Sequence, residues 1–148
     1  MQQSRRYTKV AEQFPKWIKH ESWSENLLVM SEVKCISDAS SIQADVISLK
    51  SKSNTLHVYE IKTNATPKTI NAALWQLKGF YSNYKTLVIS KETYYQIRNS
   101  SVFETITKYG IGIITFTGGD KLTFKRVKRA NYREGTYLEH WPSILAER

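Results

Sequence analysis

The first half of the chain changes from a helical to a strand-like pattern of apolar positions. Residues 7–20 carry apolar side chains at helical spacing, which predicts a helix that Pro15 can kink or split. Three later segments are apolar or alternate between apolar and polar positions, which predicts strands at residues 27–36, 44–49 and 56–62. Polar segments separate these elements, and they predict a break and two turns at residues 22–26, 37–41 and 50–54.

The second half of the chain opens with a helix-start signal. Thr66 is suited to cap a helix and Pro67 to occupy its first position, and apolar residues recur at helical spacing to about residue 83. The segments that follow predict a buried strand, a mainly helical stretch and a β-hairpin, at residues 85–90, 92–109, and 110–117 with 122–127. Beyond residue 131 the pattern is too irregular to predict an element.

This order of elements predicts a single domain of the α/β class. Three meandering strands followed by a helical crossover to another strand imply a mixed central β-sheet flanked by helices. The 148 residues contain no repeat or linker, and a chain of this length can bury a hydrophobic core. Residues from about 118 to 148 include many basic side chains, so we expect them to form a basic C-terminal hairpin or arm.

Net charge narrows the choice of partner. The chain has 22 Lys and Arg against 13 Asp and Glu, a formal charge of +9, which favours a polyanion and above all a nucleic acid. No basic amphipathic helix stands out, so a membrane is not the expected partner. The candidate DNA-binding residues lie on and after the last strand and are Lys125, Arg126, Lys128 and Arg129. The alternative interpretation of this cluster is an edge strand whose charges resist aggregation.

Hydropathy and cysteine content bear on the compartment and the metal chemistry. No apolar run approaches the roughly 20 residues that span a bilayer, and the basic N-terminal residues lack an apolar signal core. A cytoplasmic protein is therefore expected. Cys35 is the one cysteine of the sequence, which excludes an internal disulfide and a Cys-rich zinc site, and its apolar surroundings predict a buried side chain.

Two of the predicted strands carry the residues with the clearest chemistry. Glu60 and Lys62 are two positions apart, so a strand would project both side chains from one face. If the strands at 44–49 and 56–62 pair as a hairpin, Asp45 can approach Glu60 across the ladder. Two carboxylates and an ammonium group in one place suit Mg²⁺, which prefers hard oxygen ligands and bridges to phosphate oxygens.

A purely structural interpretation of these residues is also open. Glu60 and Lys62 could form an exposed ion pair on a solvated strand edge, worth well under about 1 kcal/mol. Val58 projects from the same face as Glu60, however, which indicates that this face is at least partly covered.

Asp45 and the run Glu60-Ile61-Lys62 at the end of an apolar strand resemble the motif of the PD-(D/E)XK nucleases. Ala44 stands where the motif has proline, a position that is often variable in the superfamily. The run from Gln76 to Tyr81 in the following helix is similar to a glutamine-plus-tyrosine element of many members. Later apolar segments match the usual order of core elements, so the resemblance covers residues 27–116 or so.

This resemblance implies a restriction-endonuclease-like core and a deoxyribonuclease that hydrolyses DNA phosphodiester bonds with Mg²⁺ or Mn²⁺. Asp45, Glu60 and the carbonyl of Ile61 would hold the metal. Lys62 would orient or deprotonate the attacking water, or neutralise the transition state. Gln76 would hydrogen-bond that water or Lys62, or it would face solvent.

Members of this family commonly have a third carboxylate, supplied by the first helix or the first strand. Glu32 is the first choice because it precedes Asp45 on the adjacent predicted strand, and its alternative is an exposed strand residue. Glu12 on the first helix is the second choice, and Glu25 is the third.

The resemblance also bears on assembly. One copy of this core cuts one DNA strand, so a restriction, homing, junction-resolving or repair endonuclease implies a homodimer or a larger assembly. The alternative function is a non-catalytic DNA-binding or scaffold protein on the same fold. The joint presence of Asp45, Glu60 and Lys62 disfavours that alternative.

Overall fold

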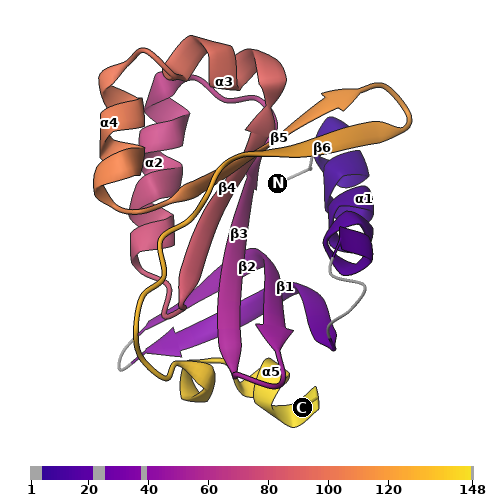
Figure 1. The fold of residues 1–148 in the computed structure, drawn as a ribbon, viewed down its shortest axis with the longest axis vertical. Coiled ribbons are helices and arrows are strands. Elements are labelled where there is room, and N and C mark those ends of the chain that lie inside the picture. Colours follow the sequence, from indigo (N-terminus) through magenta and orange to yellow (C-terminus); the bar gives the residue numbers. More distant parts are fainter. Residues whose placement is uncertain (1–4, 22–25, 38–39, 148) are drawn as a thin grey trace.

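A mixed β-sheet of six strands runs through the part of the chain that the computed structural model describes, residues 5–21, 26–37 and 40–147 (Figure 1). The strands are β1 (Leu27–Ser37), β2 (Ser40–Lys50), β3 (Thr55–Lys62), β4 (Tyr84–Ser90), β5 (Gly112–Gly118) and β6 (Leu122–Lys128). They lie in chain order across the sheet; β3, β4 and β5 pair in parallel, and the other neighbours pair antiparallel. The predicted α/β class with a mixed central sheet is confirmed.

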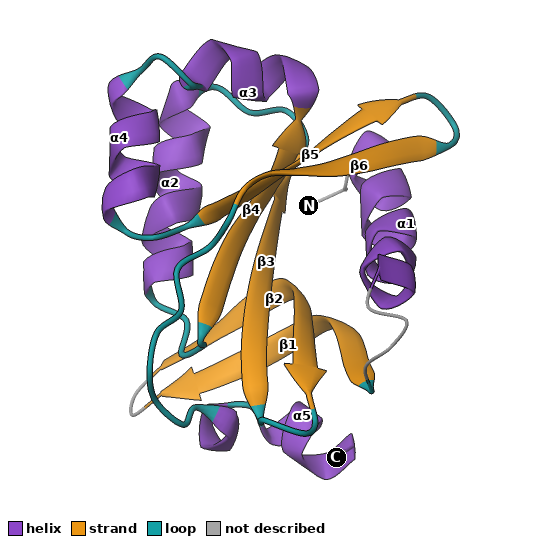
Figure 2. Ribbon diagram, viewed as in Figure 1, coloured by secondary structure: helices purple, strands orange, loops and turns teal. Residues whose placement is uncertain are grey.

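Helices cover both faces of this sheet (Figure 2). They are α1 (Arg5–Glu21), α2 (Pro67–Lys78), α3 (Lys91–Ile97), α4 (Ser101–Lys108) and α5 (Pro142–Glu147), with a 3₁₀ turn η1 (Leu138–His140) before the last of them. α1 lies on one face, while α2, α3 and α4 lie together on the other, and α5 packs beside β1 (Figure 1).

Two hydrophobic clusters follow the two faces. The face covered by α1, termed the α1 face, buries residues that include Val10, Phe14, Ile18, Val46, Tyr59, Ile61, Ile114 and Phe116. The opposite face, termed the α2 face, buries residues that include Ala44, Ile47, Val58, Ile70, Leu74, Leu77, Leu87, Ile89 and Trp141. Outside an irregular segment of β2, alternation along the strands therefore decides which face a side chain joins.

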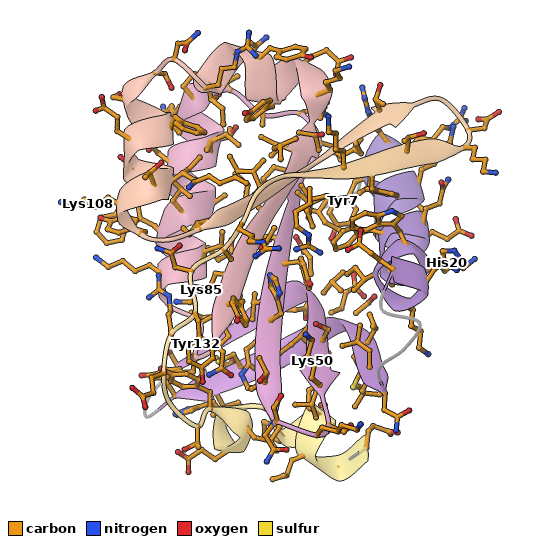
Figure 3. The ribbon with its side chains drawn as sticks, viewed as in Figure 1. Tyr7, His20, Lys50, Lys85, Lys108 and Tyr132 are labelled. Carbon is orange, nitrogen blue, oxygen red and sulfur yellow. The ribbon has the colours of Figure 1, made fainter. Side chains whose placement is uncertain are left out.

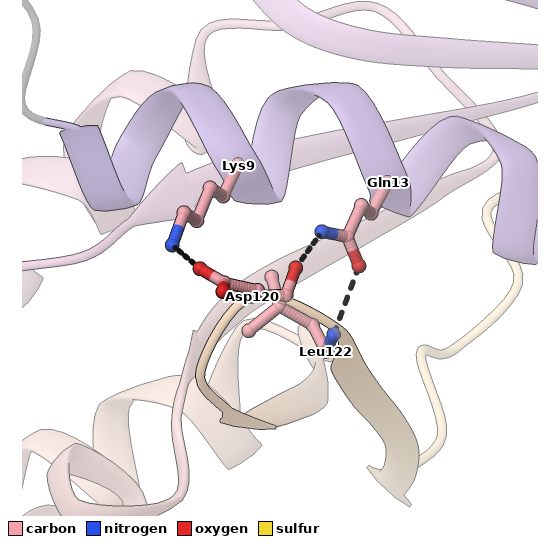
Figure 4. A network of polar contacts seen from close by, with 4 residues as sticks. All are labelled: Lys9, Gln13, Asp120 and Leu122. Carbon is pink, nitrogen blue, oxygen red and sulfur yellow. Dashed lines mark hydrogen bonds and ion pairs between the residues drawn. The ribbon is translucent and has the colours of Figure 1, made fainter.

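Polar contacts tie α1 to the turn between β5 and β6 (Figure 4). Lys9 donates to the Asp120 carboxylate at 2.6 Å. The Gln13 side chain donates to the Asp120 carbonyl at 2.7 Å and accepts from the Leu122 N–H at 2.9 Å.

Pro15 lies within α1, and the helix continues past it to Glu21, so this proline does not split the helix.

The C-terminal end of α2 differs from the prediction. The helix ends at Lys78 rather than near residue 83. Phe80 is buried and stacks on Trp141 with ring centroids 5.8 Å apart, and the Asn83 side chain accepts from a β3 N–H at 2.9 Å. These tertiary contacts require non-helical chain after α2, and they outweigh the helical spacing of the apolar residues.

The ends of the other helices and strands lie closer to their predicted positions. The stretch 92–109 is helical as predicted but forms two helices, because the N–H and hydroxyl of Ser100 both bond to the Ile97 carbonyl, at 2.9 and 2.6 Å. The strands on either side of the predicted turn at 37–41 are longer than expected and reach Ser37 and Ser40. Residues 22–25 of the predicted break and 38–39 of that turn lie outside the described residues.

Residues 118–148, expected as a basic hairpin or arm, join the body of the protein at both of their ends. β6 pairs with β5 at the edge of the sheet. Trp141 and Ile144 have no exposed surface and belong to the cluster of the α2 face. The C-terminal segment therefore returns to the core after the hairpin.

Two further observations concern the compartment and the cysteine. Among the described residues, no helix combines the length and apolar character required to cross a membrane. Cys35 is buried on β1, as its apolar surroundings predicted.

Candidate functional site

The C-terminal end of β3 brings the candidate catalytic residues next to β2. The register pairs Val46 of β2 with Tyr59 of β3. The ladder ends at this pair, and Asp45 and Glu60 are the next residues of the two strands. Asp45 Oδ2 accepts a hydrogen bond from the Ile61 N–H at 2.7 Å, so this side chain bonds directly to the β3 backbone. The approach of Asp45 to Glu60 that the sequence predicted is present.

A tyrosine from α1 also holds Asp45. The Tyr7 hydroxyl donates to Asp45 Oδ1 at 2.9 Å. Burial is the main cause that raises the pKa of Tyr7, followed by the charge of Asp45 and this hydrogen bond. Glu60 and Glu32 raise it further, so Tyr7 lies in the field of three carboxylates. The sequence prediction missed Tyr7, although it lies one helical turn before Val10 on the stripe that faces the sheet.

The carboxyl group of Glu60 is buried next to that of Asp45. Its exposure is 2%, and among the described residues its Oε2 atom has no hydrogen-bond partner. The pKa of Glu60 is raised from 4.5 to about 10, first by burial and then by the hydrogen bond and the charge of Asp45, while the charge of Lys62 lowers it. The interpretation of Glu60 and Lys62 as an exposed surface pair is therefore wrong.

The groups at this position fit a divalent cation that prefers oxygen ligands. A buried oxygen without a partner costs free energy unless a proton or a cation neutralises it. Mg²⁺ is commonly held by one or two carboxylates together with waters and substrate phosphates. Across the described residues, no group of three or more His, Cys, Asp or Glu side chains is arranged to hold a metal, unlike a closed zinc site. Asp45, Glu60 and the backbone carbonyl of Ile61 are the candidate ligands here.

An irregularity in β2 coincides with Asp45. Ala44 and Ile47 both pack into the cluster of the α2 face although they are three residues apart, which strict alternation would forbid. Glu32 lies on the neighbouring strand β1, and its backbone adopts a left-handed conformation with φ of 54°. Few residues other than glycine adopt that conformation, and such strain is concentrated at functional sites.

Within the described residues, the structure does not join a third carboxylate to this pair. The β1–β2 register places Glu32 across from Asp45, which agrees with its choice as first candidate. Glu32 is exposed, however, and it forms no metal-ligand group with Asp45 and Glu60 in the described chain. Glu12 is exposed on α1, and Glu25 lies outside the described residues.

Lys62 and Gln76 are the other candidate catalytic residues, and they lie on β3 and α2. Lys62 is half-buried two positions after Glu60, and its charge acts on that carboxyl group. Gln76 Nε2 donates to the Gln43 carbonyl of β2 at 3.4 Å, two residues before Asp45. This long bond directs Gln76 toward the strand of Asp45, and its contact with water or Lys62 stays a prediction.

A row of aligned residues continues from Lys62 across the sheet. The row joins four strands and consists of Lys62, Ile89, Thr115 and Lys125. Aligned residues point to the same face, and Ile89 assigns the row to the α2 face. Three strand spacings of about 4.8 Å separate Lys62 and Lys125 by about 14 Å.

A cationic groove opens beside this row. Its volume is about 540 Å³, and its lining includes Lys91, Tyr94, Tyr95, Arg98, Thr115 and Lys125. None of the described residues that line it is acidic. The Arg98 guanidinium lies 4.7 Å from the centroid of the Tyr95 ring, and Lys91 lies 5.7 Å from the same centroid. This groove has the charge and the aromatic surface that phosphate and base contacts require.

The four predicted DNA-binding residues do not form one patch. Lys125 and Arg126 both line the groove, but Arg126 is also paired with Glu21 of α1 at 2.8 Å. Arg129 lines a separate pocket, which Arg126 also reaches, and Lys128 is half-buried at the end of β6. β6 is an edge strand in the described sheet, as the alternative interpretation of the basic cluster requires.

Comparison with known proteins adds no assignment. No protein-family model matches the chain, and no curated protein matches its sequence. The resemblance to PD-(D/E)XK nucleases therefore rests on Asp45, Glu60 and Lys62 and on their placement in the sheet.

Proposed function

We propose that this protein is a metal-dependent DNA endonuclease with a restriction-endonuclease-like core. The observation that carries the proposal is the pair of Asp45, which is partly buried, and Glu60, which is buried two positions before Lys62 and has an oxygen without a hydrogen-bond partner among the described residues. A second support is the cationic groove on the same face of the sheet as the row that begins at Lys62. Together these features supply a site for a cation, a basic group and a path for phosphates.

Each residue of the site has a role in this proposal. Asp45, Glu60 and the Ile61 carbonyl would hold Mg²⁺ or Mn²⁺, which when bound stabilises charge on the scissile phosphate and acidifies water. Tyr7 and the Ile61 N–H hold the two oxygens of Asp45 and so fix its orientation. Gln76, anchored on β2, would position water or Lys62.

Hydrolysis of the phosphodiester needs one proton to leave water and one to reach the departing oxygen. A bond forms between the water oxygen and phosphorus, and the bond from phosphorus to the departing ester oxygen breaks. Lys62 would orient the water, accept its proton, or neutralise the charge that develops on the phosphate. One site of this kind cuts one strand, so cleavage of duplex or branched DNA would use a homodimer or a larger assembly.

The direct experiment offers the protein several forms of DNA. Supercoiled plasmid, linear duplex, single-stranded and branched DNA are incubated with Mg²⁺, Mn²⁺ or a chelator, and the products are separated by electrophoresis. We expect cleavage of at least one substrate with either metal and none with the chelator. DNA binding without metal-dependent cleavage of any substrate would contradict the proposal and favour the non-catalytic DNA-binding or scaffold protein. The lack of a three-residue ligand group in the described chain is the observation that favours this alternative.

Removal of cations from the groove is expected to weaken DNA binding and to flatten its salt dependence. The double substitution Arg98→Ala and Lys125→Ala should lower the slope of log affinity against log salt by about 2, because each lost phosphate contact removes about 0.9. Fluorescence anisotropy of a labelled duplex in chelator measures this slope without cleavage. Lys108→Ala is the matched control, since Lys108 is exposed on α4 and does not line the groove. A slope equal to that of the unsubstituted protein would exclude the groove as the DNA path.

A further inference from the structure

A second cavity lies on the α1 face, on the opposite side of the sheet from Glu60 and Lys62. Its volume is about 620 Å³, within the usual range of ligand pockets. Its floor is a cross-strand row formed by Ser48, His57 and Tyr84, with Tyr59 two positions further along β3. His57 and Tyr59 are odd positions of β3 and Glu60 is an even one, so alternation along β3 directs the pocket residues and Glu60 to opposite faces.

Aromatic rings form a continuous wall in this pocket. The His57 ring stacks on Tyr59, with centroids 4.1 Å apart and planes 13° apart. The centroid of the Tyr84 ring lies 5.3 Å from that of His57, and the centroid of the Tyr132 ring lies 5.4 Å from that of Tyr84. Tyr132 is 57% exposed, so one face of this wall is open to a planar ligand. A nucleobase stacks on such a surface whatever its sequence.

Basic side chains surround the same wall. The lining includes Lys50, Arg126 and Arg129, and none of the described lining residues is acidic. Burial lowers the pKa of His57 well below 6.5, and the charges of Arg126 and Lys50 lower it further. His57 is therefore a neutral ring in a positive field, and the field favours an anionic ligand. Arg126 shares its charge with Glu21, and Lys50 and Arg129 are the other cationic side chains of the lining.

The segment that carries Tyr132 is held in place on both sides. The Asn131 N–H donates to the Gly110 carbonyl at 2.9 Å, and the Arg133 N–H donates to the Asn83 carbonyl at 2.8 Å. The aromatic wall is thus formed before any ligand arrives, which lowers the entropic cost of binding. Figure 3 shows Lys50 and Tyr132 in the half of the molecule that carries α5, while Tyr7 lies nearer to the β5–β6 hairpin.

We infer that this pocket binds a nucleotide, with the base stacked against Tyr84 and Tyr132 and the phosphate on Lys50 and Arg129. Aromatic rings alone would accept a nucleoside, and cations alone would accept inorganic phosphate, so the combination selects the phosphorylated form. The nucleotide is either free in solution or an unpaired unit of a nucleic acid strand. The site uses neither Asp45 nor Glu60 and does not depend on the nuclease activity.

Titrations in chelator, followed by calorimetry, test this inference. The probes are adenosine monophosphate, thymidine monophosphate, adenosine, inorganic phosphate and a single-stranded tetramer of thymidylate. We expect at least one nucleotide probe, free or in the tetramer, to bind at least tenfold more tightly than adenosine or phosphate, which is about the contribution of one stacked base. Tyr132→Ala and Arg129→Ala should each weaken this binding by about tenfold, because each removes one half of the recognition. Both side chains are exposed, so thermal melting should show that the variants fold.

Two control variants, and a comparison of the tetramer with the free nucleotides, complete the test. Tyr95→Ala removes an exposed tyrosine of the other groove, and Asp45→Asn alters the candidate catalytic pair; both should retain mononucleotide binding. Tighter binding of the tetramer, lost in the same two pocket variants, identifies a strand as the source, and equal binding identifies a free nucleotide. Binding of every probe no tighter than inorganic phosphate, or full affinity in Tyr132→Ala and Arg129→Ala, would overturn the inference.

Discussion

Replacement of Lys62 by alanine is expected to lower metal-dependent DNA cleavage by about a hundred- to ten-thousandfold, the contribution of a positioned proton-transfer group. Glu60→Gln and Asp45→Asn should cause losses of at least this size, because each removes a negatively charged ligand of the proposed cation without a large change of shape. Rates of strand cleavage under single-turnover conditions measure the effect on the chemical step. The three residues serve one step, so a double variant should be little worse than the poorest single variant.

Matched controls separate this effect from general loss of charge. Lys52→Ala removes an exposed lysine of the β2–β3 turn, and Glu12→Gln neutralises an exposed carboxylate of α1. Both should keep the rate within about twofold of the unsubstituted protein, since exposed charges outside a site have small effects. Equal rates in Lys62→Ala and the unsubstituted protein would indicate a contaminating nuclease and would contradict the assignment of the site.

Glu60→Gln is expected to stabilise the metal-free protein at neutral and alkaline pH while it abolishes activity. The pKa of Glu60 is about 10 in the folded protein and 4.5 in the unfolded chain. Between these two pH values the folded protein therefore holds a proton that the unfolded chain has released. Stability of the metal-free protein therefore falls as pH rises through this window. Glutamine does not titrate, so the variant should lose this contribution to the pH dependence.

Thermal unfolding in chelator between pH 5 and pH 9 measures this difference. At pH 9 the variant should melt at least 2 °C above the unsubstituted protein, a shift equivalent to about 0.5–1 kcal/mol for a domain of this size. Added Mn²⁺ should raise the melting temperature of the unsubstituted protein and leave Glu60→Gln nearly unchanged, because a cation replaces the proton only where the carboxylate remains. Glu12→Gln is again the control. Parallel pH profiles for Glu60→Gln and the unsubstituted protein would contradict the burial of an unsatisfied carboxylate.

Local sequence spacing was sufficient to predict the central geometry of the site. The two-residue period of a strand placed Glu60 and Lys62 on one side, and the polar turn after β2 made a hairpin with β3 the simplest connection. The approach of Asp45 to Glu60 then followed from the hairpin, because the residues next to the turn fix which residues of the two strands are paired further along. Burial of Glu60 was indicated by Val58 on the same face, and the structure confirms it.

Local sequence patterns could not predict contacts between segments that lie far apart in the chain. Tyr7 was visible as a position on the apolar stripe of α1, but nothing in its helix indicates which strand residue it meets. The end of α2 was misplaced because Trp141, more than sixty positions later, packs against Phe80. The pocket on the α1 face depends on Tyr132, whose position after β6 is set by bonds to Gly110 and Asn83.

The third carboxylate illustrates a limit set by backbone geometry. Order along the chain correctly placed Glu32 on the strand next to Asp45. Regular alternation does not anticipate the left-handed φ of Glu32 or the irregularity of β2 at Asp45, and such local departures decide where a carboxylate points. The choice between Glu32 and other acidic residues therefore could not be made from spacing.

The most direct measurement is an anomalous difference map from crystals soaked in Mn²⁺. A cation at the carboxylate pair should give a peak within bonding distance of Asp45 and Glu60 and next to the Ile61 carbonyl, and this peak should vanish in Glu60→Gln crystals. A map at saturating Mn²⁺ with no peak between these two carboxylates, or an undiminished peak in Glu60→Gln, would contradict a metal centre at this end of β3.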